Sequence, residues 1–295
     1  MNRGMLSKQQ ERWLQASVAV GAALFAIAWP LAPDHAWGNL LVAALFLVTL
    51  GIGALFFLTL AQMSGAGWHV AFRRIPEAMA ATLPATGIFV LVVLAIGGQH
   101  YHVESHDLGP TYAFKLWWLG ASFRLGRALA IVLAWGLVVG LLVGALRRQD
   151  ATTSTRPTRA AFRWSAVGLV VAAVTFSVAM FDWLMALVPM WYSTVFAAYQ
   201  FAGTMQATLA VIVLLGILLS KPGRPLHDVF STEHLHDLNK LVLGFSCFWM
   251  YLWFSQFMLI WYTNIPEESS FFVPRMSGAW LGVTGLSIFV NWLLP

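Results

Sequence analysis

The chain has 295 residues, of which 59% are hydrophobic and only 10% are charged, and its mean hydropathy is +0.74. Soluble domains carry roughly 25% charged residues, so this composition excludes a cytosolic enzyme, a disordered tail and a secreted disulfide scaffold, and it requires lipid as the solvent. The net charge of +5 does not indicate nucleic-acid binding, because the basic residues lie in short connections between apolar runs.

Eight apolar stretches follow one another along the chain, and each reaches or approaches the roughly 20 residues that cross a bilayer. The sequence shows no alternation with a period of two, and a helix satisfies its own backbone hydrogen bonds in lipid, so we expect helices rather than a barrel. The predicted fold is an all-α, polytopic membrane protein with spans at approximately 13–33, 39–62, 80–98, 127–146, 164–188, 195–219, 241–263 and 278–294.

The first and last spans each have an alternative. The basic segment from Met1 to Arg12 precedes an apolar run, which is also the pattern of a cleaved signal peptide. That run is longer than the usual 7–15 residues, so an uncleaved first span is preferred. The chain stops at Pro295 just as the eighth span would finish, so a truncated last span is the alternative to a naturally short one.

Lys and Arg are distributed unequally between alternate connections. Thirteen lie in the N-terminal segment and in the second, fourth and sixth connections, whereas the odd connections hold only Lys115, Arg124, Arg127 and Arg275. Because cytoplasmic loops carry the excess of basic residues, the N-terminus is predicted to lie in the cytoplasm.

The fourth connection, RRQDATTSTRPTRAAFR, is polar and rich in Thr and Pro. We predict that this cytoplasmic linker, residues 147–163, separates a first transmembrane half (1–146, spans one to four) from a second half (164–295, spans five to eight). Each half would form a four-helix bundle.

The histidines and the single cysteine bear on cofactors. No histidine lies in the middle of a predicted span, and a transmembrane haem needs axial ligands that project from helices into the bundle. Cys247 alone supplies neither a disulfide nor an iron–sulfur ligand set. We therefore expect no haem, cluster or metal bound by this chain. The third connection offers a weak metal-ligand pattern, but a solvated loop is the preferred interpretation of His100, His102, Glu104, His106 and Asp107.

Polar residues form a stripe on each of three spans. At about 100° per residue, a shared face is predicted for Thr175 with Asp182, for Tyr199 with Gly203 and Gln206, and for Cys247, Tyr251, Ser255 and Tyr262. Polar groups avoid lipid, so we expect all three faces to point into the bundle. Helix–helix hydrogen bonding and a proton or ligand pathway both stay open as their role.

Asp182 is the most informative single residue. It lies near the outer end of span five with apolar neighbours on both sides, where a carboxylate needs a partner, a water-filled cavity or a raised pKa. Glu267 and Glu268 follow span seven on the same predicted side. An acid in this position is suited to accept a proton from a quinol, although surface loop acids are the alternative for both glutamates.

Four stretches together resemble a known family: HVAFRRIPEAM (69–79), K-x-x-W-L-x-x-x-F-R (115–124), FDWLMALVPMWYSTVFAAYQFAG (181–203) and HLHDLNKLVLGFSCFWMYLWFSQFMLIWYTNIPEES (234–269). They are similar to the smaller of the two NrfD/polysulfide-reductase-like membrane subunits of bacterial alternative complex III, called ActF. The resemblance runs from about residue 69 onward. Gly120 stands where Asn is expected, and members of the family continue to about ten spans.

This resemblance implies an inner-membrane subunit of a respiratory or photosynthetic quinol:electron-acceptor oxidoreductase that is not catalytic alone. The implied partners are the larger paralogous membrane subunit, an iron–sulfur subunit and c-type cytochromes, which hold the clusters and haems, while quinol or quinone is the candidate small molecule. Polar positions shared with the family are Asp182, Tyr199, Gln256, Glu267 and Glu268. With the polar stripes, the proton-path candidates are Asp182, Tyr199, Gln206, Tyr251, Ser255, Gln256, Tyr262, Glu267 and Glu268.

Three other functions compete with this one. A membrane anchor of a polysulfide- or nitrite-reductase-type complex would share the fold and differ in its partners. A scaffold subunit would use the polar stripes for assembly only. A secondary transporter would show broken helices and inverted repeats, and in the sequence only Pro84, near the start of span three, suggests a break.

Overall fold

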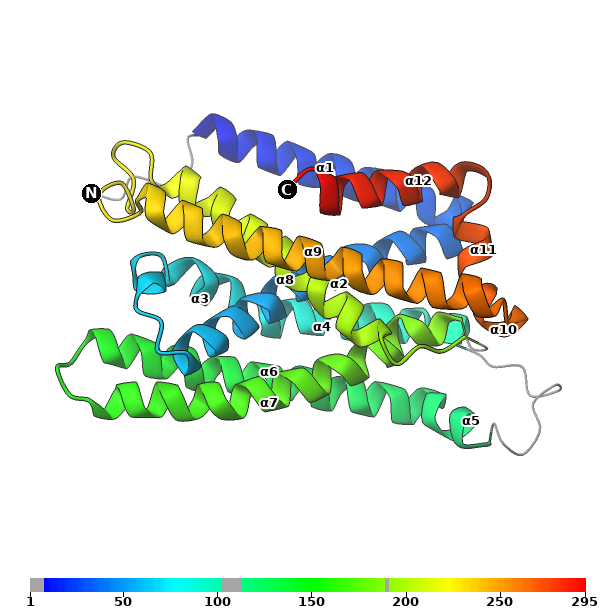
Figure 1. Cartoon of the computed structure of the whole chain (residues 1–295), viewed down its shortest axis with the longest axis horizontal. Coiled ribbons are helices and arrows are strands. Elements are labelled where there is room, and N and C mark those ends of the chain that lie inside the picture. The colour runs from blue at the N-terminus through cyan, green and yellow to red at the C-terminus, as the bar shows by residue number, and fades with distance from the viewer. Residues whose placement is uncertain (1–7, 102–112, 189–190) are drawn as a thin grey trace.

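The computed structural model describes residues 8–101, 113–188 and 191–295, and all regular structure in these ranges is helical (Figure 1). The long helices are α1 (Lys8–Leu31), α2 (Pro33–Met63), α4 (Leu83–Ile96), α6 (Ala121–Asp150), α7 (Arg156–Trp183), α8 (Phe196–Leu219), α9 (Thr232–Thr263) and α12 (Gly278–Ile288). The shorter elements are η1 (Trp68–Ala71), α3 (Arg74–Ala80), η2 (Gly98–Tyr101), α5 (Ala113–Leu119), η5 (Met185–Leu187), α10 (Pro266–Ser269), α11 (Phe272–Arg275) and η6 (Phe289–Leu293), a π-helical turn.

Seven helical segments in the described ranges are long and apolar enough to cross a membrane. They are Glu11–Leu31, Pro33–Met63, Arg74–Ile96, Ala121–Asp150, Arg156–Leu187, Phe196–Leu219 and Thr232–Thr263. These segments correspond to the first seven predicted spans. The prediction of an all-helical, multi-pass membrane protein is therefore confirmed in its helical content and in the length and apolar character of these helices.

The eighth predicted span is not one straight helix. The segments Pro266–Arg275 and Gly278–Leu293 pass the same test only as a pair, and they meet at an angle of 84°. Gly278 adopts a φ of +54°, a backbone conformation that is readily available only to glycine, and it begins the second segment. The sequence pattern of 278–294 predicted the helical part correctly, but not the short perpendicular helices α10 and α11 that precede it.

Helix α2 forms the centre of the bundle and contacts α3, α4, α7 and α8. Its inner turns are fully enclosed, with Val48, Ile52 and Leu55 at 0% exposure. A helix that is apolar on every face is either buried in a protein core or surrounded by lipid, and the central place of α2 among its neighbours agrees with this pattern. Gly53 lets α8 come close, because a Cβ atom there would lie 2.1 Å from Thr208 Oγ1.

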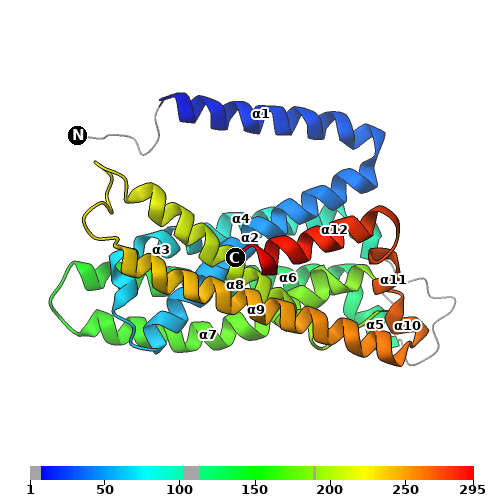
Figure 2. The ribbon, with the colours of Figure 1, turned by 45° about the horizontal axis from the view of Figure 1, so that its top comes forward.

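Helix α1 lies apart from the other helices and contacts α2 (Figure 2). None of the residues in its most apolar stretch is buried in the chain. Side chains such as Val18, Leu24 and Leu31, all at least 60% exposed, would be unfavourable in water and suit a lipid environment.

Successive connections lie at alternate ends of the bundle (Figure 1). The start of α1 and the connections 64–73, 151–155 and 220–231 share one end, which we call the basic end. The segments 97–101, 113–120, 184–188, 191–195 and 264–277 share the other, which we call the opposite end. Within the described residues, which leave out Arg3, the two groups of basic residues counted in the sequence therefore lie toward opposite ends of one molecule.

The predicted linker 147–163 is largely helical. Helix α6 continues to Asp150 and α7 begins at Arg156, so only residues 151–155 form the turn between them. Helices α6 and α7 pack side by side, and α2 contacts α7 and α8, so helices from the two predicted halves pack against each other. At the basic end, Asp150 also accepts hydrogen bonds from Arg73 and Arg74, which pair in addition with the buried Glu77 on α3.

Candidate functional site

Asp182 lies in the last turn of α7, at the opposite end of the bundle, and is 2% exposed. One carboxylate oxygen accepts a hydrogen bond from Trp118 Nε1 at 2.8 Å and the other from Arg127 Nε at 2.8 Å. These donors come from α5 and α6, so a single side chain joins three helices. The expected need of Asp182 for a partner is thus met by an arginine and an indole.

The guanidinium of Arg127 is packed between aromatic rings. Its Cζ atom lies 3.9 Å from the ring centroid of Trp118 and 4.5 Å from that of Phe123. The buried Nη1 and Nη2 atoms have no hydrogen-bond partner among the described residues. Aromatic faces stabilise a cation but accept hydrogen bonds only weakly, so this arginine keeps unused donors.

A second buried arginine lies one helical turn away. Arg124 is 2% exposed, and its Cζ atom lies 4.0 Å from the ring centroid of Tyr101. Within the described ranges, no carboxylate lies within 4.0 Å of it. The Tyr101 hydroxyl donates to the backbone oxygen of Trp183 at 2.8 Å, and burial raises the pKa of Tyr101 above its usual range. Tyr101 therefore acts as a neutral donor that fixes η2 against the end of α7.

A cavity of about 350 Å³ opens beside the end of α7. Its walls come from η5, α8, α9, α11 and α12, and two of its residues, Leu184 and Met185, directly follow the turn that carries Asp182 and Trp183. Its polar lining consists of Tyr199, Gln200, Gln256, Arg275 and Thr284.

Aromatic rings form much of the cavity wall. Trp191 and Phe271 stack with centroids 4.0 Å apart and an interplanar angle of 15°. Arg275 Cζ lies 3.6 Å from the Phe271 ring centroid, and its Nη1 donates to the Phe271 backbone oxygen at 2.5 Å. Gln256 Nε2 donates to Ser193 Oγ at 2.6 Å. The cavity thus has an apolar, flat surface with a cation and amide groups at its margin.

Deeper between α8 and α9, two side chains bind the same backbone oxygen. Gln206 Nε2 and Ser246 Oγ each donate to the Asn291 oxygen at 2.6 Å, in the π-helical turn that follows α12. The Oε1 atom of Gln206 is buried and has no hydrogen-bond partner in the part of the chain that is described. The last helical turn is therefore fixed to α8 and α9 through polar contacts.

The structure orients two of the three predicted polar stripes inward. Thr175 accepts a hydrogen bond from Trp135 Nε1 at 2.8 Å, on the same helix as Asp182, while Tyr199 packs against Trp249 and Gln206 is 6% exposed. Of the predicted proton-path residues, Tyr199 and Gln256 meet at the cavity, whereas Asp182 and Gln206 lie in separate polar clusters.

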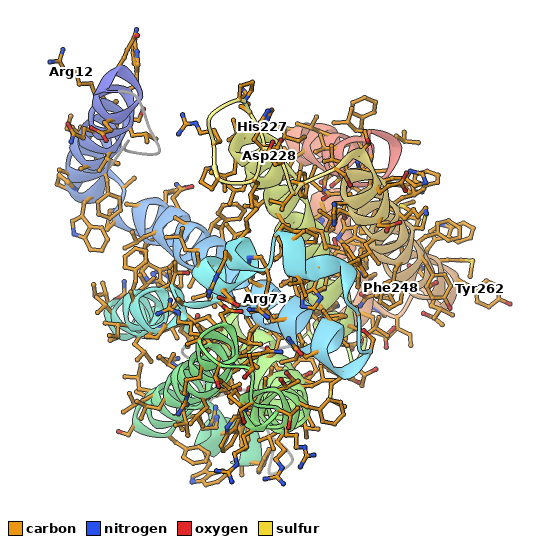
Figure 3. The ribbon with its side chains drawn as sticks, turned by 90° about the vertical axis from the view of Figure 1, so that its left-hand side faces the viewer. Arg12, Arg73, His227, Asp228, Phe248 and Tyr262 are labelled. Atoms are coloured by element: carbon orange, nitrogen blue, oxygen red, sulfur yellow. The ribbon has the colours of Figure 1, made fainter. Side chains whose placement is uncertain are left out.

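The prediction for the third stripe is wrong. Cys247 is exposed, and Tyr251 and Tyr262 are 64% and 82% exposed, so this face of α9 points out of the bundle, as Tyr262 does at the periphery in Figure 3. The face that packs inward carries Ser246, Trp249 and Gln256, and the Trp249 side chain lies against Gly203. This packing of a large ring against a glycine accompanies the observed rotation of α9, which the hydroxyl pattern did not reveal.

The other predicted site residues do not line the cavity. Ser255 is half-buried on α9. Glu267 is exposed and Glu268 half-buried on α10, at the opposite end of the bundle. Both acids therefore lie at the same end of the bundle as Asp182, and neither takes part in its cluster or lines the cavity.

Four residues that the sequence analysis missed take part in these clusters: Trp118, Arg127, Arg275 and Asn291. Arg127 and Arg275 were counted only as loop cations. An arginine inside or next to an apolar stretch is costly in lipid, and this cost was a signal that each needs an aromatic or acidic neighbour.

Within the described ranges, no three His, Cys, Asp or Glu side chains come together as metal ligands. Most of the histidine-rich third connection, with His102, Glu104, His106 and Asp107, lies outside the described residues. His69 in η1 is 1% exposed, and burial lowers its pKa, an effect that a hydrogen bond with the Ala66 backbone opposes.

Fold and site together define the class of the protein: a multi-pass helical membrane protein with buried ionic and polar clusters near one end of its bundle. No protein-family model matches the chain, and no characterised protein is significantly similar to it in sequence.

Proposed function

We propose that the chain is an integral-membrane subunit of a quinol:electron-acceptor oxidoreductase of the alternative complex III kind. Support comes from the four stretches that resemble the smaller membrane subunit of that complex, of which 181–203 and 234–269 are long and specific. In this proposal the chain holds no redox centre. Its partners are a larger paralogous membrane subunit, an iron–sulfur subunit and c-type cytochromes.

The proposed location is a bacterial inner membrane, with the basic end in the cytoplasm and the opposite end outside. The thirteen-to-four distribution of Lys and Arg supports this orientation. Asp182 and the cavity then lie near the outer surface, where protons from quinol oxidation would be released.

The observation that carries the proposal is the Asp182 ion pair. Asp182 is a buried carboxylate with one cationic partner and one indole donor, and acids inside a membrane bundle are candidates for a functional role. We propose that Asp182 takes part in proton transfer at the outer side. Tyr199 and Gln256 at the cavity and Gln206 between α8 and α9 are further polar groups of the proposed pathway in clusters separate from Asp182, whereas the exposed Tyr251 and Tyr262 would act at a subunit interface.

The test is Asp182→Asn in the assembled complex reconstituted into liposomes. This change keeps the shape and the hydrogen bond from Trp118 but removes the exchangeable charge. We expect slower quinol oxidation or reduced proton release, by about tenfold or more, with normal subunit content, because positioned acid–base groups contribute roughly 10²–10⁴-fold to rates. Asp237→Asn, at the exposed Asp237–Lys240 pair on α9, is the matched control.

A double variant separates proton transfer from a structural role. Removing one partner of a buried pair leaves an uncompensated charge and is costly, whereas removing both is often neutral. Asp182→Asn combined with Arg127→Gln should therefore restore the thermal stability that Arg127→Gln alone loses. If the double variant also restored turnover and proton release, the pair would be a structural element and the proton-transfer role would be wrong.

One observation favours a secondary transporter as a second candidate. The break of 84° between α11 and α12 lies beside the cavity, and transporters place broken helices at their binding sites. Solute uptake by liposomes that contain only this chain would support this function and contradict the first proposal.

A further inference from the structure

We propose that a second cavity, at the start of α6, binds a phosphate group through Arg124 and the backbone N–H groups of the first turn of that helix. The end of α4, η2, α5 and the start of α6 form the described part of its wall, and its volume is about 510 Å³. We call it the Arg124 cavity. This inference does not depend on the proposed function.

Arg124 supplies the cation of the site. The residue is 2% exposed, and its side chain lines the cavity. Its Nη2 atom lies beside Gly98 on the cavity wall, 3.8 Å from the point that a Cβ atom on this glycine would occupy. Its Nε atom is buried and has no hydrogen-bond partner among the described residues. The face of Tyr101 stabilises the cation but accepts hydrogen bonds only weakly, so Arg124 keeps N–H groups for an acceptor in the cavity.

The charges around Arg124 do not cancel. Arg127, one turn further along α6, has Asp182 as its ionic partner at 2.8 Å. No carboxylate in the described ranges lies within 4.0 Å of Arg124, so this group of two cations and one carboxylate has a positive charge left over. A buried charge without a counter-ion is costly in a membrane protein, and an anionic ligand removes that cost.

The start of α6 adds backbone donors to the same place. The first N–H groups of a helix have no partner within the helix, and no side chain of the described residues caps this one. Gly120, at the cap position, and Ala121, the first helical residue, both line the cavity. Helix N-termini carry a partial positive charge and bind phosphate oxygens, while an arginine binds further oxygens of the same group.

The surroundings of the cavity favour phosphate among the possible anions. Phe114 and Trp117 on α5 are mostly exposed, and exposed Trp rings are typical of the headgroup level of a membrane, where lipid phosphates lie. The exposed Ile96 lines the cavity from α4 and can contact an acyl chain. Free inorganic phosphate has the same binding chemistry as a lipid phosphate, so the experiment has to separate these two sources.

The experiment measures thermal unfolding of the delipidated full chain in a maltoside detergent. One titration compares sodium phosphate with sodium chloride at equal ionic strength. The other compares dioctanoyl phosphatidylglycerol with dioctanoylglycerol, which has the same tails and no phosphate. We expect at least one of the two phosphate compounds to raise the unfolding temperature more than its match, because a ligand of the folded state stabilises it. A rise with phosphatidylglycerol alone identifies a lipid as the source, and a rise with sodium phosphate identifies the free anion.

The first variant removes the cation. Arg124→Met should raise the ligand concentration needed for half of the maximal shift by about tenfold or more, because charge-assisted contacts of arginine with phosphate are strong. Each variant is compared with its own unfolding temperature in the absence of ligand. Arg159→Met, at an exposed position on α7 at the basic end, is the matched control and should bind as the wild type does.

The second variant tests the helix end and protects the test against misfolding. Ala121→Pro removes one backbone N–H group at the first helical position, where proline is favoured. Gly120 already has the extended conformation that a residue before proline adopts, with φ −51° and ψ 134°. We expect binding to be weaker by about threefold, with no loss of stability in the absence of ligand. If Arg124→Met does not fold, this variant alone decides the question.

Two outcomes would overturn the inference. If sodium chloride and dioctanoylglycerol stabilise the chain as well as the two phosphate compounds do, it has no phosphate site. If the wild type binds phosphate but Arg124→Met and Ala121→Pro bind it as tightly as Arg159→Met does, the phosphate is held elsewhere in the chain.

Discussion

At the scale of single residues, the chain buries several ionisable groups and compensates them in different ways. Asp182 has Arg127 as its ionic partner, Glu77 has two arginines, and Arg124 has the face of Tyr101. His69 is different, because it is 1% exposed, has no acidic partner among the described residues, and has only a hydrogen bond with the Ala66 backbone to favour its charged form. Burial and the neighbouring Arg73 both disfavour its charged form and so lower its pKa.

This lowered pKa predicts a pH-dependent stability. The unfolded chain takes up a proton on His69 below its ordinary pKa of 6.5, whereas the folded chain does so only at lower pH. The contribution of His69 to the free energy of unfolding is therefore complete above about pH 6.5 and is lost as the pH falls below that value toward the lowered pKa of the folded chain. Thermal unfolding of the wild type should show this loss, and His69→Phe should flatten it.

The control for this prediction is the exposed His236, near the start of α9. His236→Phe should leave the slope of stability against pH as it is in the wild type. An identical slope in His69→Phe would mean that other groups, such as the Glu77 carboxylate with its two arginines, account for the acid sensitivity.

At the scale of helices, close packing depends on a few glycines. A Cβ atom at Gly53 would lie 2.1 Å from Thr208 Oγ1, so α2 and α8 would have to separate to accept it. The space around Gly140 on α6 is open, because a Cβ atom added there would meet no atom within 4 Å. The two glycines therefore form a matched pair for testing the packing.

Gly53→Ala should lower the stability of the isolated chain by about 1–3 kcal/mol, as expected for overpacking of a close interface. Gly140→Ala should be neutral or slightly stabilising, because alanine favours helix more than glycine does. Unfolding in detergent measures both. A larger loss for Gly140→Ala than for Gly53→Ala would contradict the packing of α8 against α2.

The sequence predicted some of these elements and missed others for physical reasons. Spans two to seven follow from apolar length alone, which is why all of them were found. The rotation of α9 depends on how Trp249 fits against Gly203, and such shape complementarity between distant segments is not visible in a polarity pattern.

The sequence also predicted some residues of the candidate site and missed others. The apolar neighbours of Asp182 indicated that it needs a partner, but Arg127 and Trp118 are 55 and 64 residues away in the chain. The cavity depends on the short helix α11, which has too few residues to show a periodic pattern. Tyr199 and Gln256 were identified as candidates, whereas Arg275 was not.

At the scale of the whole molecule, the two ends of the bundle differ in charge, and this difference predicts its orientation. In a Cys247→Ser background, cysteine is placed at Thr153 in the α6–α7 turn or at Ser270 between α10 and α11. A membrane-impermeant maleimide added to intact spheroplasts should label Ser270→Cys and not Thr153→Cys, because the basic end should face the cytoplasm. Labelling of Thr153→Cys alone would reverse the proposed orientation.

The separation of α1 from the other helices has a consequence for how the protein can be engineered. Because α1 contacts α2 and its apolar stretch buries nothing, the surrounding lipid rather than a precise fit keeps it in place. An unrelated hydrophobic segment of similar length, with basic residues retained before it, should substitute for residues 8–31 without unfolding the remainder. The first helix is then an interchangeable module to which a purification or fluorescent tag can be attached.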